Sequence, residues 1–383
     1  MYQNAYVEVD NRIIEENARF MTENFPHKYN IAVVKGNAYG HGYGIVPALI
    51  KGGMNAFAVS TLDEALEVRK YTDLPIIMLQ PVSKEYFNIA SEQNISLCVN
   101  CIDTFKEILD SNLKLKLQIK VNSGMNRLGF KDKKELEAVV NKINESESLT
   151  LEGIFTHFHS NGLQDIEYKN DKLRFERLTE GIDLTKIPMV HVDRTQTVFL
   201  HDTPAYANGA RIGISLYGFS TVYPFRSGVK GKIRKLERKL KNKKNKVEDC
   251  KPIKVYDLKK AFSLYTKVIQ VNDVEPEEYV GYGLLHKAEA KEKIAVIDIG
   301  YGDGIGRKRY LSDVAINGKK FKIIGEVGMG MCEVLVDDSV KRGNIVTVIG
   351  GEINISDVTR KLGTTLYEVM TGIDTKIPRH YIN

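Results

Sequence analysis

The N-terminal part of the chain alternates short apolar stretches with segments in which apolar residues recur every three or four positions. The second pattern predicts amphipathic helices over 62–70, 102–111, 132–144 and 168–181. The apolar stretches have the length of buried strands and lie at 30–34, 56–60, 75–79, 95–100, 116–121, 151–157, 189–193 and 210–215. Eight strand–helix units are typical of a TIM (β/α)8 barrel. A doubly wound open sheet remains the alternative, because alternation alone does not distinguish an open sheet from a closed one.

A different pattern begins near residue 255. Turn-forming residues such as Asn317 and Gly318 separate further apolar stretches, and only 356–362 has clear helical spacing. Val7 and Val9 also alternate with acidic residues, so residues 1–7 are expected to pack with these later strands. The expected strands lie at 261–271, 294–299, 320–325, 332–336 and 344–349. The sequence therefore predicts an α/β barrel over 8–225, a basic insertion or linker over 226–254 and a β-rich domain over 255–383.

Composition and charge narrow the class of protein. The chain has 383 residues, of which 43% are hydrophobic, enough for the cores of two domains. No apolar run reaches the roughly 18 residues of a membrane helix, and the N-terminus lacks a signal pattern, so we expect a cytoplasmic protein. A membrane domain that precedes Met1 in the natural protein would not be visible here.

The net charge of +6 comes from one segment of the chain. Segment 226–246 contains eleven Lys or Arg residues and one Glu, so the rest of the chain is net negative. A solvated insertion explains this segment better than nucleic-acid binding, which we do not expect. Contact of the segment with an anionic membrane surface stays open. The four cysteines include one C-x-x-C pair, Cys98 and Cys101, which is too few ligands for a closed zinc site, so we expect reduced cysteines and no metal.

The run AVVKGNAYGHG at 32–42 carries the clearest chemical signal. Lys35 stands where the first apolar strand stops, and a lysine buried there would have a lowered pKa and act as a nucleophile toward a carbonyl group. The glycines after it allow the backbone to approach a bulky anionic ligand. A solvated lysine at the start of a flexible loop is the alternative.

Other polar residues also follow predicted strands. Lys120, His157 and Arg194 each lie at or near the end of one, and Arg211 belongs to the last predicted strand. A barrel would gather these side chains at the carboxyl ends of its strands, where the active sites of such barrels lie.

Together with MNRLG (125–129), FTHF (155–158) and ARIGISLYG (210–218), the run around Lys35 resembles the motifs of the alanine racemase family, which are fold-type III pyridoxal 5'-phosphate enzymes. The resemblance covers nearly the whole chain apart from the basic insertion. It implies a racemase that uses pyridoxal 5'-phosphate, acts on an amino acid and forms a homodimer with shared active sites. Racemisation needs two acid–base groups on opposite faces of one carbon.

The resemblance also implies roles for barrel residues. Lys35 would attach the cofactor and serve as one base. Lys120 matches a lysine that is often carbamylated, and its partner Arg127 would help to place the substrate carboxylate. His157 would bond to the arginine that contacts the pyridine ring, Arg211. The cofactor phosphate would be held by Tyr39, Arg194, Thr195 and the backbone amides of Gly213 and Ile214.

In the β-rich domain the resemblance implies three further residues. Tyr282, in VGYG, matches the second base, although Tyr279 is a close neighbour. Tyr301, in IGYGDG, matches a gatekeeper at the substrate entry. Met329 would supply a backbone N–H for the substrate carboxylate.

Several positions depart from the family pattern. The chain has Gly36 where the family usually has alanine and Arg194 where it has asparagine. It has Gly330 in place of aspartate and Glu326 in place of arginine. Thr375 replaces a tyrosine that reaches the phosphate and crowds the substrate side chain, so the pocket should be larger and more polar. This is similar to the serine-accepting racemases linked to vancomycin resistance.

The preferred substrate is therefore expected to be alanine, serine or both. The alternatives are a racemase of larger amino acids and a non-catalytic barrel that binds pyridoxal 5'-phosphate. A decarboxylase or aldolase of the same architecture is a further alternative, although the tail lacks the cysteine and acidic residue usual in such decarboxylases.

Overall fold

The computed structural model describes residues 4–160, 165–220, 233, 236–237, 240, 242–244, 251, 254 and 256–383. Most of the basic insertion at 226–246 therefore lies outside the described residues. Internal contacts divide the chain into two units. The β-rich unit comprises Met1–Ile13, Gly36–Ile45 and Lys260–Asn383, and the barrel unit comprises Ile14–Lys35 and Val46–Lys259.

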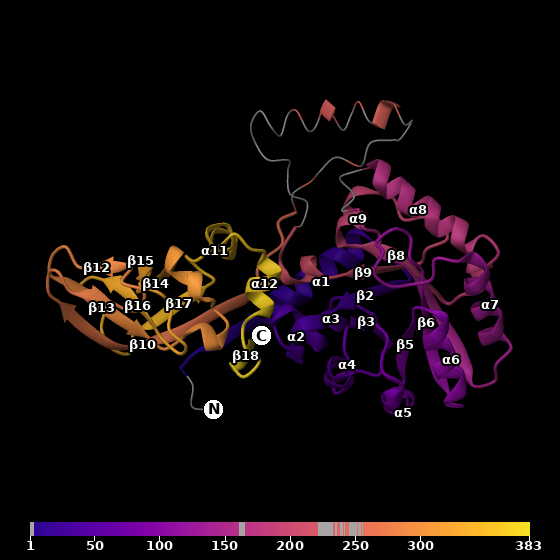
Figure 1. Cartoon of the computed structure of the whole chain (residues 1–383), viewed down its shortest axis with the longest axis horizontal. Helices are drawn as coiled ribbons and strands as arrows, with labels where there is room; N and C mark the ends of the chain where they lie inside the picture. Colours follow the sequence, from indigo (N-terminus) through magenta and orange to yellow (C-terminus); the bar gives the residue numbers. More distant parts are fainter. Residues whose placement is uncertain are drawn as a thin grey trace. The chain divides into compact units, whose positions relative to one another are not determined.

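Eight parallel strands form a closed barrel, which confirms the predicted TIM-like fold (Figure 1). The last strand pairs with the first, since Ile31 in one lies opposite Arg211 in the other. This pairing rules out the open sheet. The strands are β2 (Tyr29–Val33), β3 (Ala56–Val59), β4 (Ile76–Met78), β5 (Ile95–Val99), β6 (Leu115–Lys120), β7 (Leu149–Phe155), β8 (Met189–Arg194) and β9 (Gly209–Ile212).

Helices connect these strands, and in Figure 1 helices α4 to α8 lie around the outside of the barrel. Helix α7 (Lys133–Asn144) illustrates why these segments form helices that pack on the barrel. The Asp132 side chain caps its first turn by accepting a hydrogen bond from the Glu135 N–H, and Leu136 and Val140 are buried on one face. The other helices are α1 (Asn11–Asn24), α3 (Val46–Lys51), α4 (Leu62–Arg69), α5 (Phe87–Glu92), α6 (Ile102–Asp110), α8 (Asp165–Thr179) and α9 (Thr195–Leu200). Short 3-10 turns are η1 (Tyr43–Ile45), η2 (Lys84–Tyr86), η3 (Leu184–Lys186) and η4 (Ile214–Tyr217).

The second unit is built on an eight-stranded sheet in the order β13-β16-β15-β14-β17-β10-β1-β18. Strand β10 also pairs with β13, so the sheet curls back on itself. Its strands are β1 (Tyr6–Asp10), β10 (Phe262–Val274), β13 (Glu292–Ile297), β14 (Asp313–Ile316), β15 (Lys319–Ile324), β16 (Cys332–Val336), β17 (Ile345–Ile349) and β18 (Arg379–Ile382). The hairpin β11 (Tyr279–Val280) and β12 (His286–Lys287) and the turns η5 (Tyr301–Asp303) and η6 (Arg307–Leu311) are added to it.

The β-rich character of this unit is as predicted, and so is the position of the first strand. In β1, Val7 and Val9 are fully buried, and the strand pairs with both β10 and β18. The prediction of a single helix was wrong, because α11 (Ile355–Leu362) is followed by α12 (Leu366–Thr371). Helix α12 is too short to show a helical period in the sequence. It is fixed by the Thr365 cap, which accepts from the Glu368 N–H, and by burial of Met370.

The segment directly after Lys35 belongs to the β-rich unit by its contacts, as do residues 8–13, although both lie inside the range expected for the barrel. In α2 (Lys35–Tyr39), Gly36, Asn37 and Ala38 have left-handed dihedral angles, and φ of Tyr39 is also positive. Such angles are unfavourable for residues with a Cβ and persist only where packing holds them. Here Gly40 lies against the carbonyl group of Met370 in α12, and the Gly44 N–H donates to the Tyr381 hydroxyl of β18.

Among the described helices, none combines the length and the apolar character that a membrane crossing requires.

Candidate active site

The barrel gathers the predicted residues at the carboxyl ends of its strands. Lys120 is the last residue of β6 and is buried, and Arg194 is the last residue of β8. Thr195 begins α9, which follows β8 directly. His157 follows β7 by two residues, and Arg211 is buried within β9. Five strands thus deliver polar groups to one rim, because Lys35 follows β2 in the same way.

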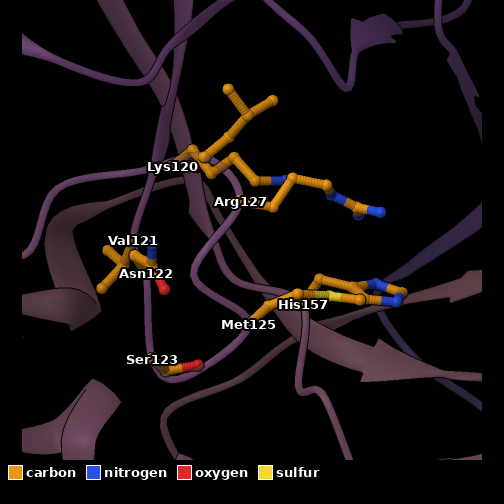
Figure 2. Close-up of a pocket in the computed structure, with 8 residues that line it drawn as sticks. Lys120, Val121, Asn122, Ser123, Met125, Arg127 and His157 are labelled. Carbon is orange, nitrogen blue, oxygen red and sulfur yellow. The ribbon is translucent and has the colours of Figure 1, made fainter.

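Lys120, Arg127 and His157 line one small cavity of about 10 Å³, the size of a single water molecule. Figure 2 shows their side chains extending to the same side of the loop that begins at Asn122. The Lys120 ammonium group lies 4.5 Å from the centre of the Phe155 ring, which stabilises its charge. Beneath it, the hydroxyl groups of Ser123 and Thr156 are hydrogen-bonded at 2.7 Å.

Arg211 is held by acceptors in β8 and directly after β7. Its guanidinium group donates to His191 Nδ1 at 2.9 Å and to the Thr156 carbonyl oxygen at 2.6 Å. The expected hydrogen bond with His157 is not formed, since Arg211 donates to His191 instead. Burial lowers the pKa of Arg211 to about 10, so the group remains charged at neutral pH.

The sequence analysis did not single out His191, which the structure places against Arg211. Burial, together with the charge of Arg211, holds its pKa well below the usual range, so the ring is neutral and Nδ1 accepts from Arg211. The Nε2–H then donates to Gln118 Oε1 at 3.0 Å, and Gln118 donates to Glu152 at 3.1 Å. The available signal was its position inside the predicted strand 189–193, where a histidine is a polar residue in an otherwise apolar run.

Both lysines at the rim have lowered pKa values. Burial lowers the pKa of Lys35, and the charge of Arg127 adds to the effect, although the residue is more exposed than a buried strand end would imply. Burial also lowers the pKa of Lys120, to about 8, with a further contribution from Arg211. Burial first, and the neighbouring arginine charges second, therefore favour the neutral form of both amines.

A second group of residues lies around the start of η4. The Thr195 hydroxyl accepts from the Gly213 N–H at 3.1 Å, and Gly213 is the N-cap of η4. The first amides of a helical turn lack intrahelical acceptors, and within the described residues the buried Ser215 hydroxyl has no hydrogen-bond partner. These groups fit a phosphate, which needs several donors in one cradle. Arg194 lies beside them and donates to the Ser160 carbonyl oxygen at 2.6 Å.

In the β-rich unit, three predicted residues meet around Gly328. Its carbonyl oxygen accepts from the Tyr301 N–H at 2.9 Å, and a Cβ built at Gly328 would lie 3.9 Å from the Tyr282 ring. Met329 follows Gly328 directly, and its carbonyl oxygen accepts from the Gly302 N–H. Tyr282 is 72% exposed and Met329 66% exposed within the chain.

Tyr39 and Thr375 belong to the same unit, and one arginine connects the two segments in which they lie. Arg379 donates to the Gly40 carbonyl oxygen at 3.2 Å and to the Asp374 carbonyl oxygen at 2.5 Å. Tyr39 packs against Tyr367 of α12, and burial raises its pKa, so its hydroxyl stays protonated. Thr375 is exposed in the turn after Asp374, whose N–H donates to the Asp303 carbonyl oxygen of η5.

The cysteine pair lies within and just beyond β5. Cys98 is buried, and burial raises the pKa of its thiol to about 12, so the thiol stays protonated. Among the described side chains, no group of three His, Cys, Asp or Glu residues is arranged to hold a metal ion.

Comparisons with known proteins agree along the chain. The family model for the alanine racemase N-terminal domain matches residues 9–221, and that for the C-terminal domain matches 261–381. Alanine racemase from Geobacillus kaustophilus is 31% identical over 389 residues, which cover 99% of this chain and 94% of that protein. Alanine racemase from Streptococcus gordonii is 31% identical over 361 residues, which cover 92% of this chain and 90% of that protein.

Solved structures show the same similarity. The crystal structure of alanine racemase from E. faecalis aligns with a TM-score of 0.85 at 29% identity, covering 100% of this chain and 99% of that one. Alanine racemase from Bacillus anthracis, solved with bound L-Ala-P, also aligns with a TM-score of 0.85 at 29% identity, covering 100% and 96% of the two chains. This chain therefore belongs to the alanine racemase family, whose members are pyridoxal 5'-phosphate-dependent isomerases.

Proposed function

We propose that the protein racemises alanine, serine or both with Lys35 and Tyr282 as the two bases. The observation that carries the proposal is the position of Lys35. Its amine follows a barrel strand, and its pKa is lowered by partial burial and by the charges of Arg127 and Arg211. A base that takes a proton from carbon must be neutral, so this lowering is what catalysis by a lysine requires.

The residues present fit the cofactor. Thr195 and the amides of Gly213 and Ile214 would hold its phosphate, with Arg194 and Tyr39 as further contacts. Arg211 would face the pyridine nitrogen, and the amine of Lys35 would attach the aldehyde carbon. When bound, pyridoxal 5'-phosphate accepts the electron pair left on the substrate carbon after its proton is removed.

Tyr282 would move the proton on the opposite face of the same carbon. It lies on an exposed surface of the β-rich unit that also includes Leu284, Leu285, Met329 and Met331. Exposed apolar side chains in such number are typical of a surface covered by a partner. We therefore propose a homodimer in which Tyr282 of one subunit acts at the barrel of the other.

Arg127 and the Met329 N–H would hold the substrate carboxylate, one by charge and one by a backbone hydrogen bond. Lys120 supports Arg127. A buried amine with a pKa of about 8 is partly neutral at physiological pH, and a neutral amine reacts with carbon dioxide. We propose that Lys120 is carbamylated, which would replace two facing positive charges with an ion pair to Arg127.

Thr375 is the reason to propose serine as a substrate in addition to alanine. Where the family pattern has a tyrosine, a threonine leaves more room and adds a hydroxyl group near the turn at Asp374. A pocket that merely admits a hydroxyl discriminates by only about a hundredfold, so activity toward alanine should persist. Racemases of larger amino acids and a non-catalytic carrier remain the alternatives.

The decisive experiment combines covalent trapping with a substrate panel. Borohydride reduction of the purified holoenzyme should leave a pyridoxyl group on Lys35 by mass spectrometry, and chiral analysis should show racemisation of L-alanine and L-serine. Lys35→Ala should abolish both signals, whereas Lys28→Ala, before the same strand, should preserve both. Trapping without turnover of any amino acid would favour the carrier, and a clear preference for L-lysine or L-ornithine would favour the broader racemase.

A further inference from the structure

A second pocket opens beside the catalytic loop of the barrel unit, outside the groups assigned above. It has a volume of about 470 Å³, within the range of roughly 300–1,000 Å³ typical of small-molecule sites. Its walls come from two places, the loop after β6 and the face of helix α8. The lining residues are Asn122, Gly124, Asn126, Lys131, Arg174, Arg177 and Leu178.

The charged side chains among the described lining residues of this pocket are all positive. Three of its seven lining residues are Lys or Arg, and none of the described lining residues is acidic. Arg174 and Arg177 are three residues apart on α8, so they project from one face of the helix, where like charges repel. Both side chains are exposed, so this repulsion is weak, and a bound anion would remove it.

Ion pairs within the protein supply little compensation. Among the described residues, Lys131 and Arg177 have no carboxylate within 4 Å. Lys133, by contrast, lies 2.8 Å from Glu180. The helix dipole favours a cation in the last turn of α8, but this accounts for Arg177 alone.

Among the described side chains, Arg174 has one acidic neighbour within 4 Å, Asp171, at 3.6 Å. Asp171 is fully buried and already accepts from His159 Nδ1 at 2.7 Å and from the His159 N–H at 2.8 Å. Its charge is therefore shared with the loop after β7, and the pocket keeps an excess of positive charge.

Asn122 connects the pocket to the catalytic loop, because it also lines the small cavity with Lys120 and Arg127. Its side-chain Oδ1 accepts from the Asn126 N–H at 3.0 Å and from the Gly124 N–H at 3.3 Å, which fixes the turn. Its NH2 group makes no hydrogen bond to another described residue. A donor amide and a fixed turn thus complete the wall opposite α8.

We propose that this pocket binds a small ligand with two or more negative charges, either a phosphate ester or a polycarboxylate. Arginine guanidinium groups match the paired oxygens of both phosphate and carboxylate. The site differs from the cradle at Thr195 and Gly213, which belongs to the cofactor. Its occupation would restrain the loop that carries Arg127.

The test is calorimetric titration of the holoenzyme with pyrophosphate and with citrate at constant ionic strength. We expect saturable binding of at least one. The double variant Lys131→Gln/Arg177→Gln should weaken it about tenfold or more, since it removes two charge-assisted contacts. The control Lys134→Gln/Lys169→Gln removes the same charge from α7 and α8 outside the pocket and should bind as the wild type. Binding of pyrophosphate alone would identify a phosphate-bearing ligand, and binding of citrate alone a polycarboxylate.

Hydrogen exchange of the same samples locates the ligand. Amides of 122–131 should exchange more slowly when it is bound. Absence of saturable binding by both anions, equal weakening in the two double variants, or slowed exchange confined to 213–217 would each overturn the proposal. Because the readout is binding, the result does not depend on whether the enzyme racemises alanine or serine.

Discussion

The two groups of proposed catalytic residues differ in how the fold prepares them. At the barrel rim, Arg211 is only 4% exposed and the pKa values of Lys35, Lys120 and His157 are all lowered by burial and by neighbouring positive charge. In the β-rich unit, Tyr282 is 72% exposed and is placed by backbone contacts around Gly328. The barrel therefore tunes the chemistry of its side chains, whereas the β-rich unit positions its residues by backbone contacts. In the proposed homodimer, the partner subunit would supply the surroundings of Tyr282.

The sharpest test of this comparison is Tyr282→Phe. Loss of a base that acts on one face of the carbon should lower kcat by about 10²–10⁴-fold while the cofactor remains bound. Tyr279→Phe, which removes a similar exposed hydroxyl nearby, is the control and should change kcat little. Rates of L-to-D and D-to-L conversion should be measured separately, together with the absorbance of the bound cofactor. Unchanged rates in Tyr282→Phe would move the second base to another residue.

A second test concerns the left-handed segment that follows Lys35. Gly40 has φ of +83°, and a Cβ there would lie 2.2 Å from the Met370 carbonyl oxygen, so Gly40→Ala should lower the free energy of unfolding by about 3 kcal/mol or more. Gly318→Ala has φ of +75° but nothing within 4 Å, so it should lose only about 1 kcal/mol. Urea unfolding of both variants measures the difference. Equal losses would show that α12 does not clamp this segment.

A Lys120 variant tests whether the barrel lowers the pKa of its buried residues at the expense of the stability of the protein. The folded protein binds the Lys120 proton less tightly than the unfolded chain, since the pKa falls from 10.5 to about 8. The buried Lys120 charge therefore lowers the free energy of unfolding by its full amount below pH 8. This destabilisation decreases between pH 8 and 10.5 and is absent above pH 10.5. Lys120→Met should raise the free energy of unfolding by about 1–3 kcal/mol at pH 7 and by little at pH 10.5.

These measurements need buffer depleted of carbon dioxide, because carbamylation would remove the same cost. Lys116→Met, at the half-buried start of the same strand, is the control and should show a much smaller difference between the two pH values. A Lys120→Met variant that is less stable than the wild type at pH 7 would contradict the idea that the amine is held at a cost.

The smallest expected effect concerns specificity. Thr375→Tyr should narrow the pocket and shift the ratio of kcat/KM for alanine over serine by about tenfold to a hundredfold toward alanine. Lys376→Tyr adds the same ring at the next exposed position of the turn and should leave the ratio unchanged. Steady-state rates with both amino acids measure this. A ratio unaffected by Thr375→Tyr would place the specificity residue elsewhere.

The sequence alone determined the elements and much of the site. The apolar stretches marked all eight barrel strands to within two residues at each boundary except the C-terminal end of β9, because fully buried parallel strands are nearly continuous apolar runs. Lys35 and Lys120 could be named because a charged residue at the end of such a run stands out, whereas the role of Arg211 came from the motif resemblance. The motif resemblance added Tyr282 and Met329, which no periodicity marks.

Only the tertiary structure decided which polar groups meet. That the barrel closes depends on the pairing of β2 with β9, two strands far apart in the chain, and no local pattern encodes it. Closure brings His191 to Arg211 in place of the expected His157, and it sets the pKa values through charges that come from different strands. Local sequence fixes helices and strands because their interactions span a few residues, whereas a site of converging charges depends on long-range contacts.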